Sequence, residues 1–205
     1  SSLSHASKSR SKSPLASANS MNQRLLFLAT CSLLSACTGY RESMPGVWRS
    51  PFPREEQLIH RIEHDNIQTV LCLRGGRTSR QTERAAVNSG AEFVCVPFSA
   101  KRLPQPEVLL QLWEVAKTAE RPIMVHCRAG VDRTGLTLAL IALHDTQDLA
   151  VARSQLAFIP NGHIAAFGTE KMDEVLDLYE PYLESLPFPL WVKNVYAEDY
   201  KRLTE

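Results

Sequence analysis

The chain has 205 residues and a formal net charge of +1, from 23 lysines and arginines against 22 aspartates and glutamates. Four of the basic residues and none of the acidic ones lie in residues 1–36, so the rest of the chain carries a net charge of −3. With no basic stripe and no internal repeat, this balance argues against a nucleic-acid-binding protein or a repeat array.

The first segment has the features of an export signal. Residues 1–20 are serine-rich and basic without apolar periodicity, and we expect them to be disordered. Residues 21–37 combine a short basic start, an apolar stretch too short to span a membrane, and small residues before Cys37. The ending Leu-Ser-Ala-Cys resembles a bacterial lipobox, in which Cys37 is lipidated. The protein would then be a lipid-anchored membrane protein of the bacterial cell envelope, facing the periplasm; the alternative is an ordinary cleaved signal.

The rest of the chain is long enough for one domain. We expect residues 1–36 to be the extension and signal peptide, 37–45 a tether, and 46–205 the domain. Strands are predicted at 47–49 (a short edge strand, ended by prolines), 68–73, 92–96 and 122–125. Helices are predicted at 54–65, 79–89, 105–119, 134–144, 148–158, 169–184 and 191–204. This alternation predicts an α/β fold with a mostly parallel central sheet of four to five strands flanked by helices.

The most informative segment follows the strand at 122–125. Residues 125–135 read Val-His-Cys-Arg-Ala-Gly-Val-Asp-Arg-Thr-Gly and lead directly into an apolar helix. Successive N–H groups of such a turn form an anion-binding concavity, helped by the positive end of the helix. The same field lowers the pKa of Cys127 and populates its nucleophilic thiolate. The residues expected to bind phosphate are Arg128, Ala129, Gly130, Val131, Asp132 and Arg133.

Individual side chains of this segment have distinct expected roles. Arg133 would close the ring, because its planar guanidinium can hold two phosphoryl oxygens into the transition state. Thr134 is expected to hydrogen-bond the thiolate, and His126 to point away from the substrate and support the loop by hydrogen bonds. The competing interpretation is a buried structural cysteine beside a surface arginine, which a bare Cys-x5-Arg pattern would favour.

The pattern His-Cys-x-x-Gly-x-x-Arg-Thr-Gly resembles the signature of the cysteine-based protein tyrosine phosphatases, and the short chain is similar to their bacterial dual-specificity-like branch. Further landmarks in the same order are Gly46-Val-Trp-Arg-Ser-Pro, Thr69-Val-Leu-Cys-Leu-Arg-Gly-Gly, Val96-Pro-Phe-Ser-Ala, and, less specifically, Gly162-His163 with Phe167-Gly168-Thr169. The resemblance implies a phosphatase fold and two in-line steps without metal or organic cofactor. Cys127 would take the phosphoryl group, and water would remove it.

One group of that family is missing at its expected place. Relatives carry a general-acid aspartate on a separate loop before the cysteine, but residues 94–102 contain no carboxylate, and Ser99 stands near that position. A proton donor contributes about 10²–10⁴-fold, so its absence matters. Three later carboxylates fall on the solvated face of a predicted helix: Glu107, Glu114 and Glu120.

Asp132 is the nearest candidate for the acid. It could equally orient Arg133 or cap the helix, since an aspartate near a helix start is favourable by itself. Further candidates from a C-terminal loop are His163, Glu170 and Asp173.

The sequence thus predicts a metal-independent phosphatase acting on a phosphorylated protein, as at phosphotyrosine, or on a small or polyanionic phosphate. Lys101 and Arg102 would favour a polyanionic substrate unless they are merely solvated. Arg74 would bind anionic substrate or form a structural salt bridge. The alternatives are a catalytically inactive phosphate-binding module at the envelope and a sulfur transferase with a persulfide on Cys127; the Arg-Thr-Gly ending argues against the latter.

Two further cysteines fall in predicted strands. Cys72 and Cys95 are expected to be buried small hydrophobes. A disulfide between them is left open by the sequence.

Overall fold

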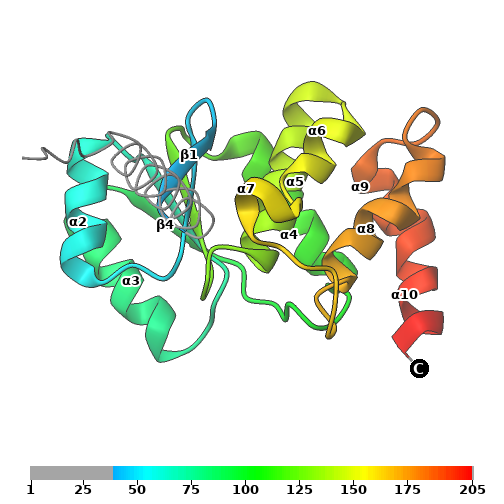
Figure 1. The fold of residues 1–205 in the computed structure, drawn as a ribbon, viewed down its shortest axis with the longest axis horizontal. Coiled ribbons are helices and arrows are strands. Elements are labelled where there is room, and N and C mark those ends of the chain that lie inside the picture. Colours follow the sequence, from blue (N-terminus) through cyan, green and yellow to red (C-terminus); the bar gives the residue numbers. More distant parts are fainter. Residues whose placement is uncertain (1–38, 205) are drawn as a thin grey trace, which may run out of the picture. The chain divides into compact units, whose positions relative to one another are not determined.

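The computed structural model describes residues 39–204 (Figure 1). The expectations for residues 1–36 and for lipidation of Cys37 lie outside these residues. Within residues 39–204, no helix is both long enough and apolar enough to cross a bilayer.

The described residues contain a five-stranded sheet in the order β1-β2-β5-β3-β4. Its strands are β1 (Arg41–Met44), β2 (Val47–Ser50), β3 (Thr69–Cys72), β4 (Glu92–Cys95) and β5 (Ile123–His126). β2, β5, β3 and β4 run parallel to one another, and β1 runs antiparallel to β2. The predicted α/β fold with a mostly parallel sheet is confirmed.

Residues 47–49 form a strand as predicted, but the prediction that this strand lies at the edge of the sheet is wrong. β1 pairs with β2 across a turn that contains Gly46 at φ +70°, and β1 occupies the edge instead. β1 lies within residues 37–45, which were expected to be a tether. Its sequence Arg-Glu-Ser-Met has no apolar alternation, so hydrophobic periodicity could not mark it as a strand.

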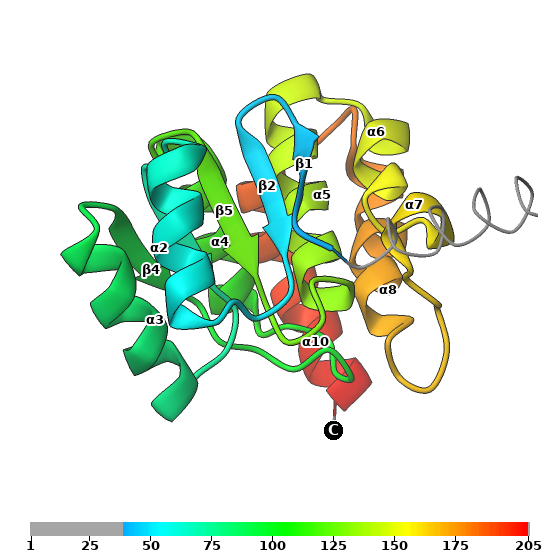
Figure 2. The same ribbon diagram turned by 60° about the vertical axis from the view of Figure 1, so that its left-hand side comes forward.

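Helices cover both faces of the sheet (Figures 1 and 2). One face carries α2 (Glu55–His64) and α3 (Arg77–Asn88); the other carries α4 (Pro106–Thr118), α5 (Asp132–Thr146), α6 (Leu149–Ser154) and α8 (Lys171–Tyr179). Side chains alternate between the two cores: Val70 and Met124 pack towards α2 and α3, whereas Leu71 and Val125 face the larger core. Burial on both faces explains why β3 and β5 read as continuous apolar runs.

The predicted C-terminal helices are divided into shorter elements in the structure. The expected helix at 148–158 is α6 followed by α7 (Phe158–Asn161), which contains Pro160. The expected helix at 169–184 is α8 and a 3₁₀ turn (Glu180–Tyr182) that contains Pro181. The third expected helix, at 191–204, is α9 (Phe188–Trp191), a π-helical turn (Val192–Tyr196) and α10 (Ala197–Thr204).

Candidate active site

Cys127 lies at the carboxyl end of the central strand, where a parallel sheet is expected to hold its ligand site. The turn that follows, residues 127–131, links β5 to α5, and we call it the catalytic turn. Both flanking strands are tied to it by main-chain hydrogen bonds: Leu73 N donates to His126 O at 2.9 Å, and Phe52 N donates to Arg128 O at 3.1 Å. The turn is therefore fixed from both sides.

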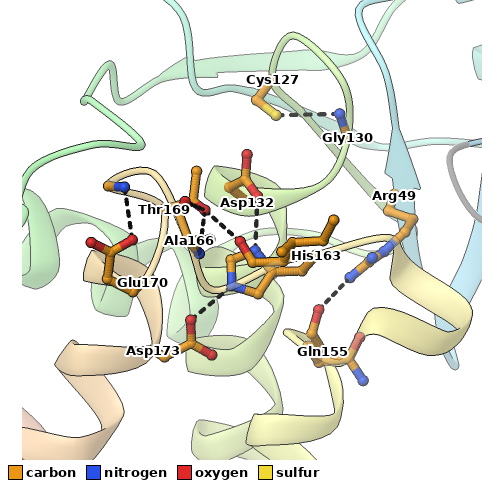
Figure 3. Close-up of polar contacts among 12 residues, drawn as sticks. Arg49, Cys127, Gly130, Asp132, Gln155, His163, Ala166, Thr169, Glu170 and Asp173 are labelled. Carbon is orange, nitrogen blue, oxygen red and sulfur yellow. Dashed lines mark hydrogen bonds and ion pairs between the residues drawn. The ribbon is translucent and has the colours of Figure 1, made fainter.

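Gly130 allows the turn to close tightly. Its φ is +74°, and a Cβ atom there would lie 2.6 Å from the carbonyl carbon of Ser50 and 2.7 Å from the nitrogen of Pro51. Its amide donates to the Sγ atom of Cys127 at 3.3 Å (Figure 3). Both the positive φ and the close approach to β2 require glycine.

The thiol of Cys127 has a lowered pKa. The residue is 3% exposed, and burial alone would raise the pKa. The hydroxyl and amide of Thr134, the charge of Arg133 and the amide of Gly130 outweigh burial and hold the pKa below its ordinary value. By contrast, burial raises the pKa of Cys72 to about 12. These contacts make the Cys127 thiol more acidic than an ordinary cysteine.

Arg133 bridges the catalytic turn and the loops that follow β3 and β4. Its Nη1 donates to the carbonyl oxygens of Leu73 at 2.9 Å and Phe98 at 3.1 Å. Its Nε is buried and has no hydrogen-bond partner among residues 39–204. A guanidinium held in place with an unused donor is suited to bind an oxyanion. The other predicted phosphate-binding residues line the same turn, Arg128 and Ala129 exposed, and Val131 buried.

His126 supports the turn, but not by side-chain hydrogen bonds as predicted. Its ring is fully buried near the ring of Phe52, with 5.9 Å between centroids, and neither ring nitrogen has a hydrogen-bond partner in the described part of the chain. Burial lowers its pKa to about 4, so the ring is neutral. The supporting contact is its main-chain carbonyl, which accepts from Leu73.

Asp132, His163 and Asp173 form one cluster beside the catalytic turn (Figure 3). His163 Nδ1 lies 2.8 Å from Asp132 Oδ1, and His163 Nε2 lies 2.7 Å from Asp173 Oδ2. The histidine side chain is 2% exposed, and the carboxylate side chains are 27% and 28% exposed. Burial opposes protonation of His163, but the two carboxylates outweigh it and raise its pKa to about 9. Residues that the sequence offered as separate candidates are therefore joined through an imidazolium.

This cluster predicts how stability depends on pH. The pKa of His163 is about 9 in the folded state against an ordinary value of 6.5, so its contribution is complete below pH 6.5 and is lost as pH rises through about 9. The shift corresponds to about 3 kcal/mol in the free energy of unfolding. Urea unfolding of wild type and His163→Gln at pH 6 and pH 9.5 measures it. A difference between the two proteins that stays constant with pH would contradict the assignment.

The remaining acid candidates lie away from the turn. Glu170 accepts from the amide of Gly168 at 2.7 Å within its own loop (Figure 3). Ser99 directly follows Phe98, whose carbonyl holds Arg133, so the position expected for an acid is near the site but bears a serine. The three helix-associated carboxylates are exposed, as predicted: Glu107, Glu114 and Glu120.

Arg74 lies near the catalytic turn. Its guanidinium carbon is 5.7 Å from the centroid of the Phe52 ring, and it forms no ion pair with any carboxylate of residues 39–204, so the structural salt bridge is not made. Cys72 and Cys95 lie opposite each other in β3 and β4 with free thiols, which donate to the carbonyl of Arg74 at 3.1 and 3.4 Å. They form no disulfide.

Arg49 is a residue that the sequence analysis missed. It lies on β2, is 1% exposed, and donates from Nη2 to the carbonyl of Gln155 at 3.0 Å (Figure 3). Its Nε and Nη1 atoms are buried without partners among the described residues. Burial and the charge of Arg41 lower its pKa to about 10, whereas Cys127 acts in the opposite direction. This buried cation favours the thiolate form of Cys127. The sequence feature that could have identified Arg49 is an arginine within a predicted strand.

In residues 39–204, no three His, Cys, Asp or Glu side chains are grouped so that they could hold a metal ion.

Comparison with known proteins gives one family match. Residues 48–147 match the family described as "Polymorphic toxin system, DSP-PTPase phosphatase". This range begins within β2 and includes the whole catalytic turn. No curated protein sequence matches the chain.

Solved structures of phosphatases share the fold. Tk-PTP superposes with a TM-score of 0.59 at 19% identity, covering 72% of this chain and 98% of its own. A putative phosphatase from Shewanella putrefaciens gives 0.54 at 16% identity, covering 70% and 89%. The catalytic domain of the PP-IP phosphatase SIW14 from S. cerevisiae gives 0.53 at 18% identity, covering 78% and 91%. At these identities the likeness concerns the fold.

Proposed function

We propose that this chain is a phosphatase of the dual-specificity-like branch of the cysteine-based protein tyrosine phosphatases and hydrolyses phosphomonoesters through a phosphoryl intermediate on Cys127. The match of residues 48–147 to a DSP-PTPase family and the shared fold support this proposal. The observation that supports this most is the lowered pKa of Cys127 in a turn that also positions Arg133. A buried structural cysteine would instead have its pKa raised, as Cys72 does.

In the first step the Cys127 thiolate attacks phosphorus. A P–S bond forms, the ester P–O bond breaks, and the leaving oxygen takes the electron pair. The main-chain amides of the turn, the N-terminus of α5 and the guanidinium of Arg133 face the charge that develops on the phosphoryl oxygens. In the second step water attacks phosphorus, the P–S bond breaks, and the thiolate returns with inorganic phosphate as product.

Covalent trapping tests this proposal. The full chain is mixed with p-nitrophenyl phosphate labelled in its phosphoryl group, with EDTA and reductant present, and quenched in acid. Label on Cys127, together with steady release of p-nitrophenol, is the expected result. Neither label nor turnover would instead favour the catalytically inactive phosphate-binding module, because an activated leaving group hardly needs an acid.

A cationic pocket supports phosphates that carry additional negative charge as the substrate class. It measures about 530 Å³ and is lined by Lys101, Arg102 and Lys171, with no carboxylate among its lining residues. Lys171 pairs with Glu174 at 2.5 Å, but Lys101 and Arg102 are exposed and form no ion pair within the described chain. They lie on the loop whose Phe98 carbonyl holds Arg133.

The same loop is packed against the segment that carries His163. A Cβ atom on Gly168 would lie 3.2 Å from the Cβ of Lys101. The chain therefore places two uncompensated cations where they can attract the non-reacting phosphates of a substrate.

Removing these two charges is expected to change substrate preference. Lys101→Ala with Arg102→Ala should raise KM for an inositol polyphosphate about tenfold, since two partly solvated charges contribute about 1–2 kcal/mol. The kinetics with p-nitrophenyl phosphate should not change. Lys117→Ala, which removes an exposed cation from the far end of α4, is the matched control. Equal losses on both substrates would point to a folding defect and reject the subsite.

A further inference from the structure

Asp132 lies where its carboxylate could accept a proton during catalysis, instead of donating one as an acid would. It lies at the start of α5, within the anion-binding turn, and one of its carboxylate oxygens is held by His163. Figure 3 shows Asp132 between His163 and the turn that carries Cys127 and Gly130. Its side chain is 27% exposed, so water can reach it.

Positive groups surround the carboxylate of Asp132. His163 is an imidazolium at neutral pH, because Asp132 and Asp173 together outweigh the effect of its burial. Asp132 also faces the positive N-terminus of α5 and is followed in the chain by Arg133. The imidazolium donates from Nδ1 to one Asp132 oxygen, so the carboxylate is held as a hydrogen-bond acceptor. A general acid for the first step would instead have to donate a proton.

We infer that Asp132 is the general base of the second step, and that His163 is the positioning residue that holds its carboxylate in orientation. This inference rests on the proposed function. Asp132 accepts a proton from the water whose oxygen forms the new P–O bond. The P–S bond breaks, its electron pair returns to Cys127 as thiolate, and the proton on Asp132 passes to solvent.

The role of Asp173 follows from the same geometry. Its Oδ2 accepts from Nε2 of His163, so the ring is fixed from the side opposite Asp132. A histidine that is hydrogen-bonded at both ring nitrogens cannot rotate without breaking a charge-assisted hydrogen bond. The orientation of Asp132 therefore depends on α8, which carries Asp173 and lies outside the catalytic turn.

Rapid-mixing kinetics with p-nitrophenyl phosphate and the full chain test this inference. Asp132→Asn should release the first equivalent of p-nitrophenol at nearly the wild-type rate and then turn over about 10²-fold more slowly, because only the second step needs a base. The thiophosphate on Cys127 should accumulate in acid-quenched samples. His163→Leu should give the same burst with a smaller loss, and His163→Gln, which keeps a donor to Asp132, should restore part of the steady rate.

Glu170→Gln is the matched control. It exchanges a carboxylate for an amide in the same loop, where Glu170 contacts the amide of Gly168, and it should leave both kinetic phases unchanged. If His163→Leu does not fold, Asp173→Asn perturbs the same cluster. It should also show a burst of p-nitrophenol, with a smaller loss of the steady rate.

Two results would overturn the inference. One is a first turnover that slows in Asp132→Asn, most strongly with phenyl phosphate, whose leaving group is poorer; Asp132 would then be the acid. The other is an Asp132→Asn protein with both phases unchanged. A wild-type protein that forms no phosphorylated cysteine would contradict the proposed function itself. This result is seen with the wild type alone, before any variant is measured.

Discussion

Cys127→Ser is expected to lower kcat for p-nitrophenyl phosphate on the order of 10⁵–10⁶-fold, the loss seen when an enzyme nucleophile is removed. A serine hydroxyl stays protonated at neutral pH, so the amides and cations that favour the thiolate have no anionic nucleophile to act on. The phosphate-binding parts of the turn remain in place, because Arg133 is held by two main-chain carbonyls. Tungstate should therefore still raise the midpoint of thermal unfolding.

Cys95→Ser is the control for this exchange of sulfur for oxygen. Cys95 ends β4, and its thiol donates to the Arg74 carbonyl rather than to the catalytic turn. Activity should stay close to that of the wild type. Full activity in Cys127→Ser would remove the proposed mechanism, whereas loss of tungstate binding as well as activity would show that the turn had collapsed.

Gly130→Ala is expected to reduce kcat/KM by at least about 100-fold, because displacement of catalytic groups by roughly 1 Å has a cost of this size. The new methyl group would lie 2.6–2.7 Å from main-chain atoms of Ser50 and Pro51, and main chain cannot move aside as a flexible side chain can. The turn itself must shift, which displaces the Gly130 amide from the sulfur of Cys127. Steady-state kinetics with p-nitrophenyl phosphate measures the loss.

A substitution at Gly90 distinguishes the effect of backbone strain from the effect of steric overlap. Gly90 has φ +82°, similar to Gly130 at +74°, but a Cβ atom there would meet nothing within 4 Å. Gly90→Ala should lower the free energy of unfolding by about 1–2 kcal/mol, the cost of a left-handed alanine, and leave kcat/KM unchanged. If the two variants lost activity equally, strain alone would explain the effect and the close packing of Gly130 on β2 would be irrelevant.

Much of the fold was predictable because most elements carry strong local signals. The buried strands β3 and β5 read as short apolar runs, and α4 and α5 lie within two residues of their predicted bounds. β1 could not be found, since its stability comes from pairing with β2 and its own side chains are polar. The predicted helix at 169–184 ran through Pro181, where the structure has a 3₁₀ turn instead.

The candidate site also has a part that the sequence could predict and a part that it could not. The residues of the catalytic turn are contiguous in sequence, so their approach to one another is fixed by one strand, one turn and one helix. The contact between Asp132 and His163 joins residues 31 positions apart, and no local pattern encodes it. His126 shows the limit even within the turn: its position was predictable, but its burial without side-chain partners depends on how the surrounding elements pack.

The strand order has a consequence for biosynthesis. β5 lies between β2 and β3, yet it is the last of the five strands to emerge from the ribosome. Until it arrives, the facing edges of β2 and β3 have no partner, and unpaired edges favour association with other chains. Cys127, the proposed nucleophile, is the residue directly after this closing strand. A nascent or truncated chain that lacks it therefore has neither a completed sheet nor a reactive cysteine, and chemical competence appears only together with the finished fold.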